Sequence, residues 1–221
     1  MCPGGTVVAA TSEPGRVVTN GMSQYSRNER NANAGLVVGI EPVDYPQESV
    51  AFIDAFGPVR GAMYAREALE LIANEAQAVH PLAGINLQRQ LESNAFVLGG
   101  SNYQAPGQLV GEFIAGKASI NFGTVQPSYQ PGVKLGDLQE SLPDYAIAAL
   151  REALPVFGKK IRGFDMPDAV LTGVETRTSS PLRMPRGEDF QSVNTLGLFP
   201  GGEGAGYAGG ILSAGVDGIR L

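Results

Sequence analysis

The sequence predicts an α+β protein with a small, mostly antiparallel sheet, a helical lobe, and a C-terminal segment of strand, glycine loop and helix. Short β-branched runs separated by turn residues occupy residues 5–40, which is typical of antiparallel strands. Between residues 58 and 157, apolar residues recur every three or four positions, as on the buried face of a helix. Glycines then crowd residues 200–210, which indicates a loop of unusual backbone conformation.

A β-hairpin is expected near the N-terminus. Residues 6–10 and 16–19 are apolar and β-branched, and the Ser12-Glu13-Pro14-Gly15 sequence between them favours a turn. Residues 36–40 form the next apolar run, which Pro42 closes, so a third strand is expected there. Because the connections are short, these strands are expected to pair mostly antiparallel.

Three helices are expected in the middle of the chain. The first covers residues 58–79, where apolar side chains form one stripe, and it ends at His80-Pro81. The second covers residues 83–98, and a shorter third covers residues 106–115. Together they predict a helical lobe beside the sheet.

A fourth helix is expected to begin at Ser141-Leu142-Pro143-Asp144, where a capping residue, a first-turn proline and an acidic residue coincide. Pro155 is expected to kink or end this helix. Residues 169–174 are apolar and predict a further strand.

Composition excludes several classes of protein. Of 221 residues, 43% are apolar and 17% are charged, which is typical of a folded chain with a sizeable core. The net charge is −6 and no basic cluster is present, so neither nucleic acid nor an anionic membrane is an expected partner. No apolar run approaches the ~20 residues of a membrane span, and the N-terminus has no signal-peptide pattern, so a cytoplasmic location is expected.

The chain has one cysteine and one histidine. Cys2 has no cationic residue or second cysteine nearby to lower its pKa, so we interpret it as structural, and it has no partner for an internal disulfide. Because His80 is the single histidine, a metal cluster of several histidines is excluded; no Ser-His-Asp triad is expected and no metal site is predicted. No catalytic residue is nominated.

The most informative stretch is residues 195–221. Leu196, Leu198 and Phe199 predict a short buried strand, and a helix is expected from Ile211 onward, after the glycines. Glycines admit close backbone approach, and free N–H groups with the helix dipole favour an anion. The alternative is a tight turn that needs glycine for steric reasons alone. The predicted binding loop comprises Gly202, Glu203, Gly204, Ala205, Gly206, Tyr207, Ala208, Gly209 and Gly210.

This loop matches neither of the two common nucleotide motifs. No Lys-Ser or Lys-Thr follows it, as a Walker loop requires, and the sequence ends before the acidic residue that a dinucleotide fingerprint places about 20 residues further on. Glu203, within the glycines, instead offers a carboxylate to a sugar or ribityl hydroxyl. Upstream, Arg177 and Arg183 lie among hydroxyl residues and are candidates for binding an anionic substrate; the alternative is an exposed, hydrogen-bonded loop.

Three segments resemble a known family. The Gly-Leu-Phe-Pro-Gly-Gly-Glu-Gly-Ala-Gly sequence of residues 197–206 resembles the second flavin-contacting motif of two-part FAD oxidoreductases. Cys-Pro-Gly-Gly at residues 2–5, Thr-Arg-Thr-Ser-Ser-Pro at 176–181 and Gly-Glu-Gly-Ala-Gly-Tyr-Ala-Gly-Gly at 202–210 resemble bacterial FAD-dependent dehydrogenase-like proteins. The resemblance implies FAD as the cofactor of a longer protein, held in part by the loop at its ribityl–pyrophosphate region, with Arg177 and Arg183 near the substrate or the flavin edge.

The resemblance also implies the domain organisation. No strand–Gly-x-Gly-x-x-Gly–helix unit for the ADP half of FAD is present, so we expect the chain to be a C-terminal portion whose partner is an N-terminal FAD-binding domain. Residues 1–165 are expected to form an inserted, substrate-covering lobe, and residues 166–221 the last part of the FAD-binding domain. The implied function is part of a flavin-dependent oxidoreductase, inactive by itself. The alternative is a non-catalytic nucleotide-binding or protein-interaction module.

Overall fold

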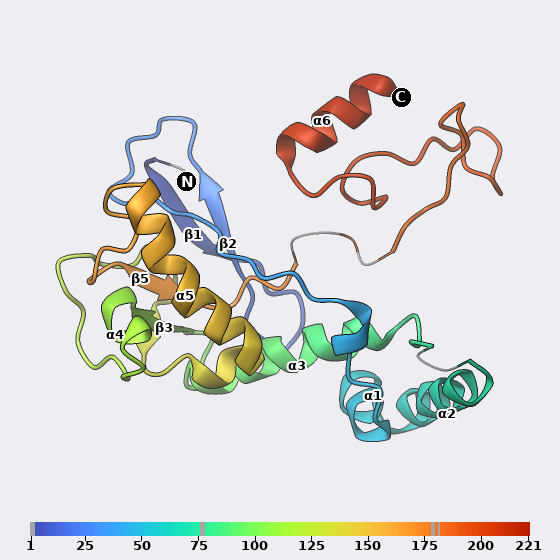
Figure 1. Ribbon diagram of the computed structural model, residues 1–221, viewed down its shortest axis with the longest axis horizontal. Helices are drawn as coiled ribbons and strands as arrows, with labels where there is room; N and C mark the ends of the chain where they lie inside the picture. The colour runs from blue at the N-terminus through green and yellow to red at the C-terminus, as the bar shows by residue number, and fades with distance from the viewer. Residues whose placement is uncertain (1–2, 76–77, 178–179, 181) are drawn as a thin grey trace. The chain divides into compact units, whose positions relative to one another are not determined.

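The computed structural model describes residues 3–75, 78–177, 180 and 182–221 (Figure 1). Cys2 therefore lies outside the described residues. The chain divides into two compact units, Met1–Thr176 and Arg177–Leu221, called here the N-terminal and C-terminal units.

Helices combine with two small sheets, which confirms the α+β class. The strands are β1 (Gly5–Ala9), β2 (Thr19–Ser23), β3 (Ala105–Leu109), β4 (Val133–Leu135) and β5 (Val170–Thr172). The helices are α1 (Ser49–Phe56), α2 (Pro58–Asn74), α3 (Ala83–Leu98), α4 (Val110–Ile114), α5 (Asp144–Lys160) and α6 (Ile211–Arg220), with 3₁₀ turns η1 (Pro42–Asp44) and η2 (Gln139–Ser141).

The expected hairpin is present, with its second strand shifted toward the C-terminus. β1 pairs antiparallel with β2, in a register that sets Ala9 opposite Thr19. The expected third strand at residues 36–40 is not formed: these residues are half-buried or exposed and pair with no strand in the described part of the chain. Instead, the Asn33 amide donates to the carbonyls of Thr6 and Met22, so a side chain rather than a strand satisfies the hairpin there.

The helical lobe of the N-terminal unit consists of α1, α2 and α3. α3 has the predicted bounds, α2 ends five residues earlier than expected, and α1 was not predicted. A side chain at Gly61 would collide with the Phe52 carbonyl and Ile53 backbone, so glycine permits the close approach of α1 and α2. His80 is buried against Phe52, and its Nδ1 accepts the Leu82 N–H at 3.1 Å, so its contacts are within the helical lobe.

The prediction of a helix at residues 106–115 is wrong for the first half of that range. β3 occupies that half, parallel to β4 and antiparallel to β5, and only α4 is helical. Pro106 and Gly107 are poor helix formers. The fully buried Gln108 then fixes the strand, since its side-chain amide donates to the Lys117 carbonyl and accepts the Leu138 N–H.

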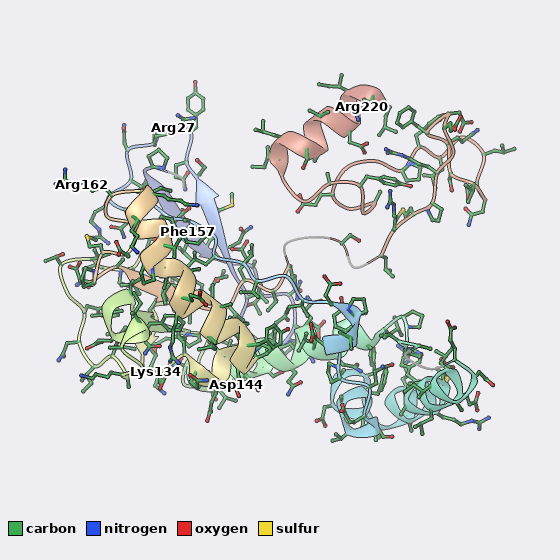
Figure 2. All side chains as sticks on the ribbon, viewed as in Figure 1. Arg27, Lys134, Asp144, Phe157, Arg162 and Arg220 are labelled. Atoms are coloured by element: carbon green, nitrogen blue, oxygen red, sulfur yellow. The ribbon has the colours of Figure 1, made fainter. Side chains whose placement is uncertain are left out.

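Pro155 was expected to kink or end α5, and the helix does not end there but continues to Lys160. Figure 2 shows Asp144 at its N-terminal end and Phe157 near its C-terminal end. The helix survives the lost hydrogen bond because Ile147 and Leu154 are each 1% exposed and pack with α4 residues. The strand expected at residues 169–174 is present as β5.

The C-terminal unit contains α6, as expected, but no strand at residues 196–199. Those residues form turns and extended chain, and Leu196 is 91% exposed, so the apolar run is not buried as a strand would be. The unit begins after Thr176, whereas the sequence placed a boundary after residue 165, because β5 pairs with β3 in the N-terminal unit. Within the described residues, no helix has the length and apolar character that crossing a membrane requires.

Candidate functional site

The predicted loop, residues 202–210, is a closed turn that leads directly into α6. The Tyr207 N–H donates to the Gly202 carbonyl at 3.0 Å, and the Gly206 N–H donates to the Glu203 carbonyl at 3.0 Å. Residues 203–205 lie between these two closures. Glu203 and Gly204 are exposed, and no described residue accepts from the N–H groups of Gly204 and Ala205. The turn therefore presents the N–H of the exposed Gly204 beside an exposed carboxylate, whereas Ala205 is buried.

The glycines of the loop differ in whether the fold requires them. Gly202 has φ +67° and Gly206 has φ +80°, which side chains rarely adopt. A Cβ at Gly206 would also lie 2.7 Å from the Leu182 carbonyl oxygen, so the fold requires glycine there. A Cβ at Gly204 would meet nothing within 4 Å. Glycine at 204 is therefore not required by the described packing.

An ion pair between Arg186 and Asp217 holds the loop against α6. The guanidinium binds the carboxylate through two hydrogen bonds, Nη2 to Oδ1 at 2.6 Å and Nη1 to Oδ2 at 3.0 Å. Arg186 Nη1 also donates to the Pro200 carbonyl at 2.7 Å, and Asp217 Oδ2 accepts the Gly202 N–H at 2.8 Å. The side chains are only 9% and 11% exposed. One pair thus fixes both the entry to the loop and the helix behind it.

Tyr207 completes this anchor. The Arg186 guanidinium lies 3.7 Å from the centre of the Tyr207 ring, and that of Arg183 lies 4.3 Å from it. The Tyr207 hydroxyl accepts a hydrogen bond from the backbone N–H of Arg186 and donates one to the Met184 carbonyl, each at 3.1 Å. Tyr207 therefore serves the internal structure of the C-terminal unit, on the side of the loop where residues 183–186 pass.

The Arg186 guanidinium and the Gly202 N–H hold the pKa of Asp217 at about 2, below its ordinary value of 3.8. Because the folded-state pKa is lowered, Asp217 stabilises the C-terminal unit above about pH 4, and this stabilisation is lost as the pH falls toward 2. We expect the protection factors of the α6 amides, which correct exchange rates for the slower intrinsic exchange in acid, to fall over that range. In an Asp217→Asn variant, the protection factors should already be low at pH 7 and change less on acidification.

The two predicted arginines have different surroundings. Arg183 contacts Tyr207 and so lies beside the loop. Arg177 is an exposed residue at the beginning of the C-terminal unit, and residues 178, 179 and 181, which separate it from Arg183, lie outside the described residues. The contacts that the structure describes for the loop do not include Arg177.

The sequence interpretation missed Arg186 and Asp217. It attached no role to either residue. One signal was available: α6 contains a single acidic residue, and it lies on the opposite side of the helix from the apolar positions 211, 212, 215, 216 and 219.

Comparison with known proteins then places the chain. A profile of the family described as "FAD-dependent protein, C-terminal domain-like" matches residues 1–71 and 60–178. The chain belongs to this family. An uncharacterised protein of Clostridium beijerinckii (strain ATCC 51743 / NCIMB 8052) is 47% identical over all 221 residues, which make up 36% of its length. The family match covers the N-terminal unit and ends before the glycine loop, whereas the similarity to the Clostridium protein includes the loop.

Proposed function

We propose that this chain is the C-terminal part of an FAD-dependent oxidoreductase and that its C-terminal unit contacts the ribityl–pyrophosphate region of FAD. Membership of the family supports FAD as the cofactor of the whole protein. The observation that carries the proposal is Gly204, an exposed glycine that the described packing does not require and whose N–H donates to no described residue. A glycine of this kind is explained by close approach of something outside the unit.

The residues present fit such a cofactor region. The N–H group of the exposed Gly204 is a donor for a phosphate oxygen, and the positive end of α6 begins at Ile211, just after the loop. The exposed Glu203 carboxylate is an acceptor for a ribityl hydroxyl. The flavin, when bound, supplies the redox chemistry, whereas the chain supplies orientation and electrostatics. Arg183, beside the loop, and Arg177 are proposed to meet the substrate or the flavin edge.

The outer face of α6 supports a partner domain. Ile211, Leu212 and Ile219 are 86–89% exposed and Val216 is 49% exposed, all on one side of the helix. Asp217 lies on the opposite side, where it anchors the loop. An amphipathic helix that turns its apolar face outward is explained by burial against another polypeptide. We propose that this polypeptide is an FAD-binding domain outside these 221 residues. A cytoplasmic location remains a prediction.

The experiment is an absorption spectrum of the natural protein, comprising this chain and any polypeptide that flanks it. We expect a yellow protein with flavin absorption, and weak or no FAD binding by the 221 residues alone. A colourless natural protein that also fails to bind added FAD would favour the alternative, a non-catalytic nucleotide-binding or protein-interaction module, for which the apolar face of α6 also provides a surface.

Glu203→Gln should weaken FAD retention only modestly. The amide oxygen still accepts a hydrogen bond, so the variant should lose less than the roughly 1.5–3 kcal/mol of a charge-assisted hydrogen bond. Equilibrium dialysis of the natural protein against FAD measures this loss. Glu188→Gln, an exposed substitution in the same unit but outside the loop, is the matched control and should bind FAD as the wild type does. Equal affinity of the Glu203→Gln protein and the control would remove Glu203 from the site.

A further inference from the structure

A cavity of about 480 Å³ lies entirely within the N-terminal unit. Its wall is formed on one side by the β1–β2 hairpin, the segment 30–36 and β5, and on the other by α4 and α5. The volume falls in the range of about 300–1,000 Å³ that is typical of small-molecule sites. Much of the lining is aliphatic, including Leu36, Val110, Leu138, Ile147, Leu150 and Leu154.

The cavity is lined by residues of two hydrophobic clusters. Val17, Ala95 and Tyr129 belong to one buried cluster, whereas Val110 and Ile147 belong to another. Leu142, which lines the cavity, packs against both clusters. The cavity is partly open to solvent, so a small molecule can enter it.

Hydrogen bonds hold the hairpin side of the cavity in place. The Val7 N–H donates to Ser128 Oγ at 2.8 Å, and the Thr19 N–H donates to the Val174 carbonyl at 2.9 Å. Asn33 ties β1 and β2 together through its side-chain amide. These hydrogen bonds fix the hairpin to the segments around residues 128 and 174.

One carboxylate at the cavity receives no hydrogen bond from any described residue. Glu175 Oε2 lies 3.8 Å from the place that a Cβ on Gly35 would occupy, and both residues line the cavity. No described residue donates a hydrogen bond to Glu175 or forms an ion pair with it. The residue as a whole is exposed, but burial of its carboxyl group raises the pKa of Glu175. A partly buried carboxylate is stabilised by a donor, which the described protein does not provide.

The other charged residue of the lining is Arg30. It is exposed and directs Nη2 to the Gln126 carbonyl at 2.8 Å. Arg30 thus already donates to a protein acceptor, whereas Glu175 is the charged residue of the described lining that receives no hydrogen bond from a described residue.

We propose that this cavity binds a small, largely aliphatic molecule carrying an amino group, with its ammonium against Glu175 and its apolar body among the aliphatic side chains. An ammonium offers three N–H donors, and its charge matches that of the carboxylate. The proposal concerns the N-terminal unit alone and holds whether or not the glycine loop contacts FAD.

The test compares decylamine, decanol and decanoate by isothermal titration calorimetry below their micelle concentrations. We expect the purified wild-type protein to bind decylamine at least about tenfold more tightly than decanoate, as loss of one charge-assisted hydrogen bond predicts. Glu175→Gln should abolish this preference while leaving decanol binding unchanged. Glu152→Gln, an exposed substitution on α5 away from the lining, should leave it intact.

A second variant shows that the cavity itself is occupied. Ala34 lines the cavity but is exposed, so Ala34→Phe should obstruct the entrance without disturbing the core, and a thermal melt checks that it folds. Weaker binding of both decylamine and decanol by this variant supports the proposal. The proposal is overturned by absence of decylamine binding, by preference for decanoate, or by binding that Ala34→Phe leaves unchanged.

Discussion

Arg186→Met will unfold the C-terminal unit while the N-terminal unit stays folded. Methionine keeps much of the apolar stem but leaves the shielded Asp217 carboxylate without its cation and the Pro200 carbonyl without its donor. Few other buried side chains stabilise this unit, because its buried residues, among those described, are Pro200, Ala205 and Asp217. Hydrogen exchange should therefore rise throughout residues 182–221 and remain slow in β3 and α5.

Arg183→Met is the matched control for this prediction. Arg183 also stacks on Tyr207, but it is exposed, and among the described contacts it pairs with no carboxylate. Its loss should cost about 0.5–1 kcal/mol, as an exposed cation–π contact does. A double variant, Arg186→Met with Asp217→Leu, should recover part of the protection, because it removes the unpaired charge. Slow exchange in Arg186→Met alone would show that the ion pair does not hold the unit.

Gly206→Val will also disrupt the C-terminal unit, for a different physical reason. The backbone at Gly206 has φ +80°, which costs a residue with a side chain about 1–3 kcal/mol. The valine Cβ would additionally lie 2.7 Å from the Leu182 carbonyl oxygen, so the backbone at residues 182–183 must move. We expect fast hydrogen exchange in residues 182–207 and loss of flavin from the natural protein.

Loss of flavin from Gly206→Val would by itself say nothing about cofactor contact, because the fold is lost with it. Retention of both slow exchange and flavin would contradict the backbone conformation described for Gly206. Flavin loss with exchange unchanged would mean that the valine meets the cofactor and not residue 182.

Elements with a clear apolar spacing were predictable from sequence. α3 and α6 followed the 3.6-residue pattern, and their boundaries coincide with glycines that end or precede a helix. β3 was not predicted, because its five residues include Pro106 and Gly107 and carry a buried glutamine in place of an apolar side chain. The apolar residues 196–199 predicted a strand that is absent, since periodicity does not report whether a neighbouring strand is available to pair.

The glycine loop depends on contacts between residues far apart in the sequence, which periodicity does not report either. Sequence alone identified residues 202–210 as a loop that needs glycine, but it treated Gly204 and Gly206 alike. The difference between them depends on the Leu182 carbonyl, which lies 24 residues away in the chain and reaches Gly206 only in the folded unit. The Arg186–Asp217 pair, separated by 31 residues, was hidden for the same reason.

The flavin-to-protein ratio of a Gly204→Val variant of the natural protein tests the central claim most directly. Within the described residues, nothing lies within 4 Å of a Cβ at this position, so the variant should fold with wild-type hydrogen exchange in the C-terminal unit. If the loop contacts FAD, valine occupies the space of the cofactor, and the variant should purify with little flavin. A folded Gly204→Val protein that retains wild-type flavin would contradict the account and make the glycine loop a structural turn.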